Sequence, residues 1–180
     1  MKKKSHQILF ETSKKFGQTS LGMNSNFMWN IDPKKLFISM ARYKFVSRVL
    51  EGKKNVLEIG GEPFRSRIVK QNVKNLTVYT KEEFTYNESL DNKNKNFKIN
   101  FRLQNLDQTK VNKKNKKFDG IYALDFINKL SKKKEKLFLN NCLNLLDSNG
   151  IFVLGTPSKE SKKFASNILS WSIKMHIVEM

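Results

Sequence analysis

Hydrophobic and polar positions along the chain predict helices that alternate with short buried strands. Between Asp32 and Gly52 apolar residues recur at helical spacing, and Asp32-Pro33 is a typical helix start. Short apolar or strictly alternating segments then predict strands at residues 55–59, 76–79, 97–103, 118–125 and 151–155. Helical patterns separate most of them, at residues 66–72, 82–90 and 131–146. This order favours right-handed crossovers and a largely parallel sheet.

We therefore expect an α/β fold, a Rossmann-like three-layer αβα sandwich with a mostly parallel sheet. Residues 1–31 are polar and mixed, and we expect an N-terminal arm or lid there. Its aromatic residues Phe16, Phe27 and Trp29 either cover a ligand or pack the arm against the body. Residues 32–180 form the expected domain, and the length of 180 residues suits a single core.

The net charge of +19 raises the question of a nucleic-acid partner. Almost all of the positive charge is lysine, whereas recognition of phosphates and bases favours the forked guanidinium of arginine. Lys, Asn, Ile and Phe share AT-rich codons, so a biased genome also explains the composition. The lysine-rich runs at residues 92–96 and 112–117 fall between predicted elements, where solvated loops are expected. Nucleic-acid binding stays open but is not favoured.

The sequence carries no sign of a membrane span, a signal peptide or a metal cluster. No apolar run approaches the ~18 residues that a span requires. The basic start is followed only by Ile8, Leu9 and Phe10, too few for the apolar core of a signal peptide. The single Cys142 lies on the apolar stripe of a predicted helix, so we expect it to pack in the core. We expect a cytoplasmic protein without a bound metal.

Candidate chemistry lies where the first predicted strand ends, at Glu58-Ile59-Gly60-Gly61-Glu62. Parallel sheets bind ligands at the carboxyl ends of their strands. Glycines there let the backbone approach a ligand closely, and the following helix offers free N–H groups. Glycine after a strand is also ordinary turn chemistry, so both interpretations remain open on this segment alone.

Residues 56–62 resemble the first motif of the class I S-adenosylmethionine-dependent methyltransferases, an acidic-x-Gly-x-Gly loop after the first strand. Residues 118–125 look like the fourth-strand segment of that family. Residues 143–157 are similar to its helix, turn and fifth strand, and residues 32–46 resemble the helix before the first strand in bacterial members. The resemblance covers roughly residues 16–165 and implies S-adenosyl-L-methionine as the cofactor.

The resemblance also implies roles for individual residues. Glu58 would contact the methionine amino group, with Gly60 and Gly61 beneath the ligand. Tyr79 or Thr80 stands where the family has the acid that holds the ribose hydroxyls, and Asn105 matches a position beside the adenine. Asp125 lies on the methionine and acceptor side and is the candidate catalytic acid or base. The implied cofactor-binding set is Glu58, Gly60, Gly61, Glu62, Tyr79, Thr80, Asn105 and Asp125.

The sequence also departs from the family pattern. The first loop is one residue short, and Pro63 lacks an N–H with which to cradle a ligand. Strand two lacks its acid, with Glu82 and Glu83 just beyond. Residues 158–180 suffice for one helix and a short stub, so we expect the last two strands of the class I sheet to be missing. The chain would then be truncated, or a partner or second copy would cover the sheet edge.

Three functions follow from this pattern. The first is methyl transfer from S-adenosyl-L-methionine to a small-molecule or cell-surface sugar-type acceptor. The second is a non-catalytic or degenerate protein that keeps the methyltransferase fold, which the short loop and the short C-terminal segment favour. The third is an RNA methyltransferase, which the basic charge favours. A nicotinamide-binding protein fits less well, because the loop does not supply Gly-x-Gly-x-x-Gly.

Overall fold

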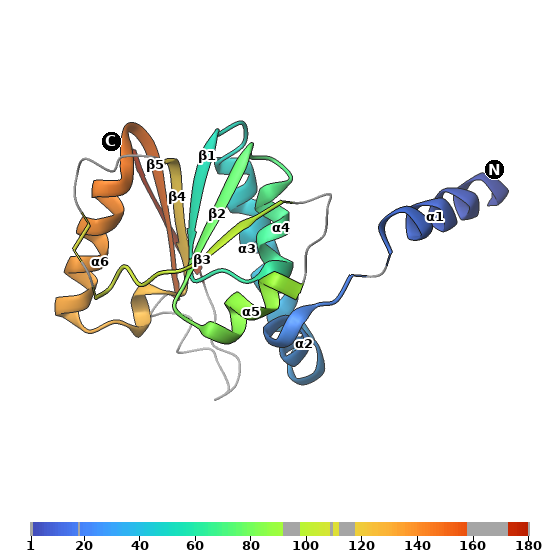
Figure 1. Cartoon of the computed structure of the whole chain (residues 1–180), viewed down its shortest axis with the longest axis horizontal. Coiled ribbons are helices and arrows are strands. Elements are labelled where there is room, and N and C mark those ends of the chain that lie inside the picture. Colours follow the sequence, from blue (N-terminus) through green and yellow to red (C-terminus); the bar gives the residue numbers. More distant parts are fainter. Residues whose placement is uncertain are drawn as a thin grey trace.

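The computed structural model describes residues 2–17, 19–91, 98–108, 110–111, 118–157 and 173–179 (Figure 1). The helices are α1 (Lys2–Phe16), α2 (Gly22–Ile31), α3 (Pro33–Val49), α4 (Pro63–Lys70), α5 (Glu83–Asp91), the 3-10 helix η2 (Ile127–Lys129) and α6 (Lys132–Leu145). The strands are β1 (Asn55–Ile59), β2 (Asn75–Thr80), β3 (Asn100–Leu103), β4 (Phe118–Leu124), β5 (Leu146–Pro157) and β6 (Ile173–Glu179). The lysine-rich runs at 92–96 and 112–117 lie outside the described residues.

The six strands form one sheet in the order β3-β2-β1-β4-β5-β6. The five strands from β1 to β5 are parallel to one another, and β6 runs antiparallel to β5. The chain moves outward from β1 to β2 and β3, then returns to place β4 on the other side of β1. This reversal leaves a crevice at the carboxyl ends of β1 and β4, the usual ligand site of such sheets.

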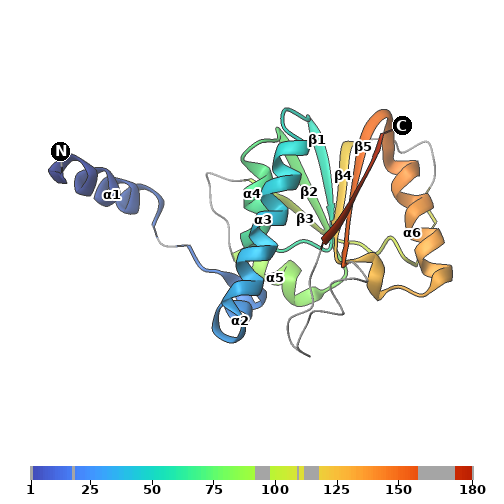
Figure 2. The same ribbon diagram turned by 180° about the vertical axis from the view of Figure 1, so that it is seen from behind.

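Alternate residues of the central strands face two separate hydrophobic layers. Leu57 and Ile121 pack with α6 residues such as Phe138. Val56 and Tyr122 pack on the other face with residues of α3 and α4. Both views show α6 on one side of the sheet and α3 with α4 on the other (Figures 1 and 2). The αβα sandwich predicted from the strand pattern is therefore confirmed.

The N-terminal segment contains two helices that the sequence pattern did not predict. Helix α1 projects away from the body (Figures 1 and 2). Helix α2 instead packs against α3 and α4. Asp32 ends α2 and caps α3, where its carboxylate accepts a hydrogen bond from the N–H of Lys35 at 3.0 Å. Helix α2 thus ends at Ile31, directly before the N-cap of α3.

The expectation that the last two strands of the sheet are missing is wrong for one of them. Strand β6 pairs with β5 from Ile151–Glu179 to Pro157–Ile173, along the edge that we expected a partner or second copy to cover. Ile173, Met175 and Ile177 alternate with polar residues, which is a strand pattern that the assignment of a helix and a stub overlooked. Residues 158–172, where that helix was expected, lie outside the described residues. No helix in the described ranges is both long and apolar enough to span a membrane.

Candidate functional site

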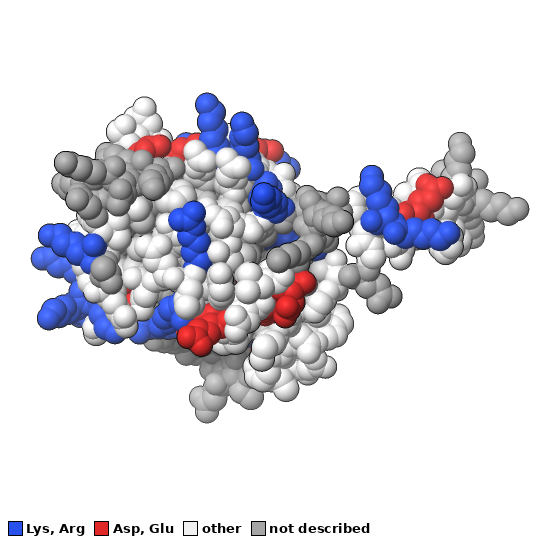
Figure 3. Space-filling view, in the orientation of Figure 1, with Lys and Arg blue, Asp and Glu red and all other residues white. Residues whose placement is uncertain are grey.

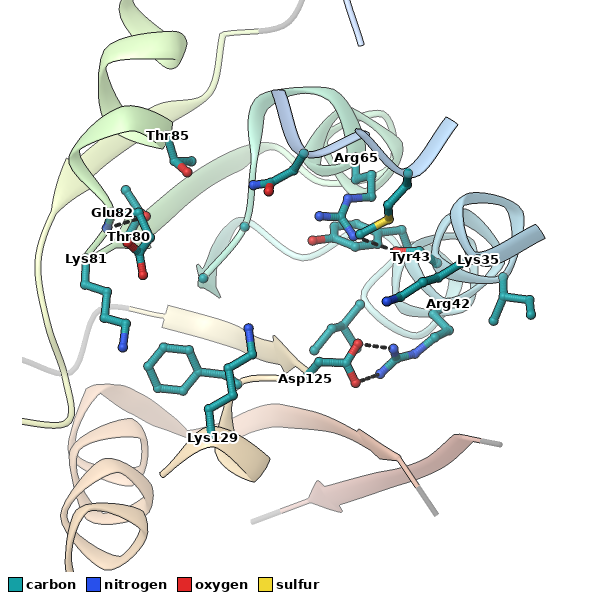
Figure 4. Close-up of a pocket in the computed structure, with 18 of the residues that line it drawn as sticks. Lys35, Arg42, Tyr43, Arg65, Thr80, Lys81, Glu82, Thr85, Asp125 and Lys129 are labelled. Carbon is teal, nitrogen blue, oxygen red and sulfur yellow. Dashed lines mark hydrogen bonds and ion pairs between the residues drawn. The ribbon is translucent and has the colours of Figure 1, made fainter. Parts of the chain in front are cut away.

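A cavity of about 590 Å³ lies at the carboxyl ends of β1, β2 and β4. Its size is typical of small-molecule sites, which measure roughly 300–1,000 Å³. The strand ends and the loops after them form one wall, and α3 with Arg65 of α4 forms another. Asn24 and Met28 bring α2 to the same cavity. The pocket therefore uses segments that are distant in sequence and meet only in the folded chain (Figure 4).

The turn after β1 brings bare backbone to the cavity. Gly60 has a φ of 76°, which favours glycine, and its N–H donates to the carbonyl of Tyr79 at 2.8 Å. A Cβ at Gly60 would lie 3.1 Å from the ring of Phe126, which also lines the cavity. Because Gly60 and Gly61 carry no side chain, a ligand in the cavity can approach the backbone of this turn closely.

Glu58 lies behind this turn and not in the cavity. Its side chain is almost completely buried, and its carboxylate accepts hydrogen bonds from Tyr43 at 2.7 Å and Tyr122 at 2.6 Å. Burial raises the pKa of Glu58 and raises the pKa of both tyrosines well above the ordinary value, so the phenols stay protonated and donate. A Cβ at Gly61 would lie 2.1 Å from Glu58 Oε1. Gly61 thus leaves room for a buried carboxylate directly beneath the turn.

Glu62 joins the glycine turn to α2 and α4. Its carboxylate accepts a hydrogen bond from Ser25 of α2 and from Arg65 Nε at 2.7 Å, and Arg65 also donates to Ser39 of α3 at 2.7 Å. Glu62 is also the N-cap of α4, because it accepts from the N–H of Arg65. Pro63 is the first residue of that helix, where an N–H has no helical partner in any case. Pro63 thus stands at a helix position where proline is favoured, and the N–H of Arg65 at this helix end is bound to Glu62.

Asp125, after β4, and Arg42 of α3 form a bidentate ion pair at one wall of the cavity (Figure 4). The second bond, from Arg42 Nη2 to Asp125 Oδ1, measures 2.9 Å. Asp125 follows β4 with a φ of 57°, a left-handed conformation that few non-glycine residues adopt. Its N–H donates to the carbonyl of Gly155 at 2.9 Å, which holds this turn against β5. The side chain of Arg42 is 6% exposed and that of Asp125 is 28% exposed, so Asp125 presents the accessible part of the pair.

The end of β2 supplies Thr80, Lys81 and Glu82 to the cavity. The hydroxyl of Thr80 accepts a hydrogen bond from the N–H of Glu82 at 3.2 Å, which fixes the turn into α5. Glu82 is exposed and is the first carboxylate after β2. Tyr79 points into the opposite layer, where it meets Phe118 edge-on at 6.4 Å. Glu82 therefore brings a carboxylate to the cavity two residues after Thr80.

Four of the eight predicted cofactor-binding residues line the cavity: Gly60, Gly61, Thr80 and Asp125. The other four lie outside its lining: Glu58, Glu62, Tyr79 and Asn105. Asn105 instead accepts a hydrogen bond from the N–H of Asp107 at 3.0 Å. Of the aromatic residues expected as a lid or as packing, none lines the cavity, and Trp29 packs edge-on against Phe37 at 6.3 Å.

The structure brings further residues to the site that sequence analysis did not assign. Lys35, Lys129 and Met28 line the cavity from α3, η2 and α2. Arg42 and Tyr43 of α3 also line the cavity, and both are buried. A helical wheel of α3 could have shown that Leu36, Tyr43 and Arg42 lie near the same buried side. For Met28 the sequence carries no comparable signal.

Comparisons with known proteins find likeness in structure but not in sequence. No sequence-family model matches the chain, and no curated protein matches its sequence. The N-methyltransferase NodS from Bradyrhizobium japonicum WM9, solved with S-adenosyl-L-homocysteine, aligns with a TM-score of 0.58 at 17% identity, over 69% of this chain and 63% of that one. The DhpI–SAH complex aligns with a TM-score of 0.58 at 15% identity, over 76% and 65% of the two chains.

The match therefore spans less than two thirds of the NodS and DhpI chains in these structures. A protein described as a 4+2 cyclase, SpnF, also aligns, with a TM-score of 0.55 at 16% identity over 64% of this chain and 44% of that one. Proteins that share this fold are thus named for different reactions, so the fold alone does not identify the reaction. The described part of this chain has the fold of the class I methyltransferases.

Proposed function

We propose that the chain binds S-adenosyl-L-methionine in the cavity at the carboxyl ends of β1, β2 and β4, and transfers its methyl group to a small-molecule acceptor. The observation that carries this proposal is the bare glycine turn at Gly60, set at the topological switch point of the sheet and facing a cavity of suitable size. The structures of NodS and DhpI contain S-adenosyl-L-homocysteine, which is the demethylated cofactor, and this supports the proposal.

The residues of the cavity fit the two ends of such a cofactor. The carboxylate of Glu82 can accept hydrogen bonds from both hydroxyls of a ribose. On the other side of the turn, Asp125 and Arg42 offer a carboxylate and a guanidinium to an amino-acid group. Glu58 does not touch the cavity, so its proposed contribution is negative charge beneath Gly61, fixed in place by two tyrosines.

When bound, the cofactor supplies an electrophilic methyl group on a sulfonium. The protein must then hold the acceptor in line with that methyl group and keep water away. Both carboxylate oxygens of Asp125 accept from Arg42, so we propose Asp125 as a positioning and binding residue more than as a general base. Met28 of α2 also lines the cavity.

The charge distribution on the described part of one face gives no support for RNA as the acceptor. On the face shown in Figure 3, lysines and arginines are spread over several elements with acidic side chains between them. Nucleic-acid proteins instead gather basic residues on one face or along one groove. A small acceptor also suits the volume of the cavity better than a nucleic-acid strand does.

Titration calorimetry with S-adenosyl-L-methionine and S-adenosyl-L-homocysteine tests the proposal. We expect one site in the wild type and affinity about tenfold weaker in Glu82→Gln, since the amide loses one charged acceptor. Glu83→Gln is the matched control, because Glu83 is the exposed next residue and does not line the cavity. Absence of heat at millimolar ligand would support the non-catalytic alternative and refute the proposal. Turnover is then measured as S-adenosyl-L-homocysteine released in the presence of a small-molecule cell extract.

A further inference from the structure

The most exposed of the large hydrophobic side chains belong to helices α1 and α2. Among the described residues, those at least 62% exposed are Ile8, Leu9, Phe10, Met23, Phe27 and Ile31. Single exposed apolar side chains are ordinary on a protein surface, whereas a local concentration of them marks an interaction surface. The two N-terminal helices therefore need a partner that accepts apolar side chains.

Met23, Phe27 and Ile31 form one stripe along α2. They are spaced by four residues and are each 64–66% exposed, so they lie on the same, solvent-facing side of the helix. Another side of α2 faces the fold, where Met28 lines the cavity. The sequence of residues 16–31 contains no charged residue, although 28% of the whole chain is charged. This α2 stripe is thus an apolar and uncharged surface on a strongly charged protein.

Helix α1 has an apolar side of its own. At about 3.6 residues per turn, Ile8, Leu9 and Phe16 fall on one side of the helix, and Glu11 and Lys14 fall on the other. An isolated helix of this length is marginal in water and is normally stabilised by packing an amphipathic face. Both ribbon views show α1 projecting away from the body (Figures 1 and 2). We therefore expect the support for its apolar side to come from another surface.

Positive charge accompanies these apolar side chains. Helix α1 contains five lysines and one glutamate, and Lys34 is exposed just after α2. The ammonium group of Lys14 lies 4.6 Å from the ring centre of Phe10, so a cation and an apolar group lie side by side. A membrane surface that contains anionic lipid offers a partner to both. Its negative headgroups lie above hydrocarbon, which an amphipathic helix enters by about 5–10 Å.

Other partners match this surface less well. A second copy would bring another net charge of +19, so the two copies repel each other. Nucleic acid supplies negative charge but no apolar layer for the α2 stripe. Protein interfaces favour arginine over lysine, and the first arginine of this chain is Arg42. Anionic lipid therefore accounts for the apolar and the charged residues together.

We infer that α1 and α2 bind the surface of a membrane that contains anionic lipid. The apolar side of α1 and the α2 stripe lie in the interfacial layer, and the lysines contact the headgroups. Asn24 and Met28 of α2 line the cavity, so membrane binding through this helix holds the cavity near the lipid surface. The interaction does not depend on the proposed methyl transfer.

Co-sedimentation of the full chain with lipid vesicles tests this inference. One set of vesicles contains phosphatidylcholine alone, and the other contains about 30% phosphatidylserine as the anionic lipid. We expect binding to the anionic vesicles to be at least about tenfold tighter and to weaken as salt is added, since several lysines contribute. Absence of binding to the anionic vesicles would overturn the inference.

Two aromatic variants separate insertion from the general attraction of a basic protein to anionic lipid. Phe27→Ser should weaken binding about tenfold, because it removes an apolar side chain that enters the lipid. Phe45→Ser removes an exposed phenylalanine of α3 outside α1 and α2 and should bind as the wild type does. Equal weakening in the two variants would overturn the inference.

Two lysine variants make the same comparison for charge. Lys14→Gln/Lys15→Gln should weaken binding at least about tenfold, because two ammonium groups leave the headgroup layer. Lys133→Gln/Lys136→Gln removes the same charge from exposed positions on α6 and should weaken binding about twofold or less. Equal losses would show diffuse adsorption of the whole basic surface and would contradict the assignment to α1 and α2.

A fluorescent label reports whether α2 enters the lipid. Cys142 is buried, so an environment-sensitive thiol dye reacts with the introduced cysteine of Phe27→Cys. Its emission should shift to the blue with anionic vesicles, whereas the same dye on Phe45→Cys should not respond. Equal spectra at the two positions would refute insertion. A dimer in the absence of lipid that Phe27→Ser dissociates, measured by sedimentation equilibrium, would assign the α2 stripe to a second copy and overturn the inference.

Discussion

The substitution Gly61→Ala should damage the protein through one steric contact. The new Cβ would lie 2.1 Å from Oε1 and 2.5 Å from Oε2 of Glu58, far inside van der Waals distance. The carboxylate of Glu58 would have to move, and its hydrogen bonds from Tyr43 and Tyr122 would be strained or lost. Each such bond to a charged group contributes about 1.5–3 kcal/mol, so the free energy of unfolding should fall by about 3 kcal/mol or more.

Gly52→Ala separates this steric effect from that of backbone conformation. Gly52 has a φ of 79°, and a Cβ there would meet nothing within 4 Å. Its substitution should lower the free energy of unfolding by about 1–2 kcal/mol, which is the cost of holding a non-glycine residue in the left-handed conformation. Equilibrium unfolding in urea measures both free energies, and a common slope shows that the native states are comparable.

The double variant Gly61→Ala/Glu58→Ala gives the decisive comparison. If the clash with Glu58 is the cause, adding Gly61→Ala to Glu58→Ala should cost about 1 kcal/mol or less, because the obstructing carboxylate is gone. A cost for Gly61→Ala no larger than that of Gly52→Ala would refute the reasoning. So would full additivity of the two substitutions at Glu58 and Gly61.

Three further predictions concern the buried groups. Tyr122→Phe removes one donor to Glu58 and should lower the free energy of unfolding by about 2 kcal/mol, measured in urea, with a smaller loss in a Glu58→Gln background. Burial raises the pKa of Glu58, so the folded state binds its proton more tightly than the unfolded state. Its stability contribution is complete below the unfolded pKa and is lost as the pH rises through the folded one. The melting temperature of Glu58→Gln relative to that of the wild type should therefore increase as the pH rises. A difference between the two melting temperatures that does not change with pH would contradict this. Burial also raises the pKa of Cys142, so a thiol reagent should modify it only at the rate of unfolding, and rapid labelling of the native protein at neutral pH would oppose the assignment to the core.

The sheet could be predicted from the sequence because its strands carry strong local patterns. Segments such as residues 56–59 and Phe118–Leu124 are short, mostly apolar and bounded by polar residues. Strand β6 was missed because it follows a long segment without a clear pattern, so its alternation stood alone. Helix α2 was missed because its apolar residues Phe27, Trp29 and Ile31 do not follow one buried stripe and remain exposed.

The candidate site was only half predictable, for a physical reason. The glycines after β1 and Asp125 after β4 lie at strand ends, which the strand pattern itself locates. The partners of these residues come from elsewhere in the chain, and pairs such as Arg42–Asp125 leave no local trace in the sequence. Glu58 and Glu62 were assigned to the ligand from the motif, but packing directs them to tyrosines and to Ser25.

The ion pair between Arg42 and Asp125 joins residues 83 positions apart, and the bond between Ser25 and Glu62 joins residues 37 apart. The walls of the cavity thus come together only after α2, α3, β1 and β4 have all assembled. A ligand that fills it would report on the assembly of these elements and would stabilise all of them at once. Fragments that end before β4, as they emerge during synthesis, would lack the site however well their helices form. Ligand binding would then distinguish chains in which these elements have assembled from chains in which they have not.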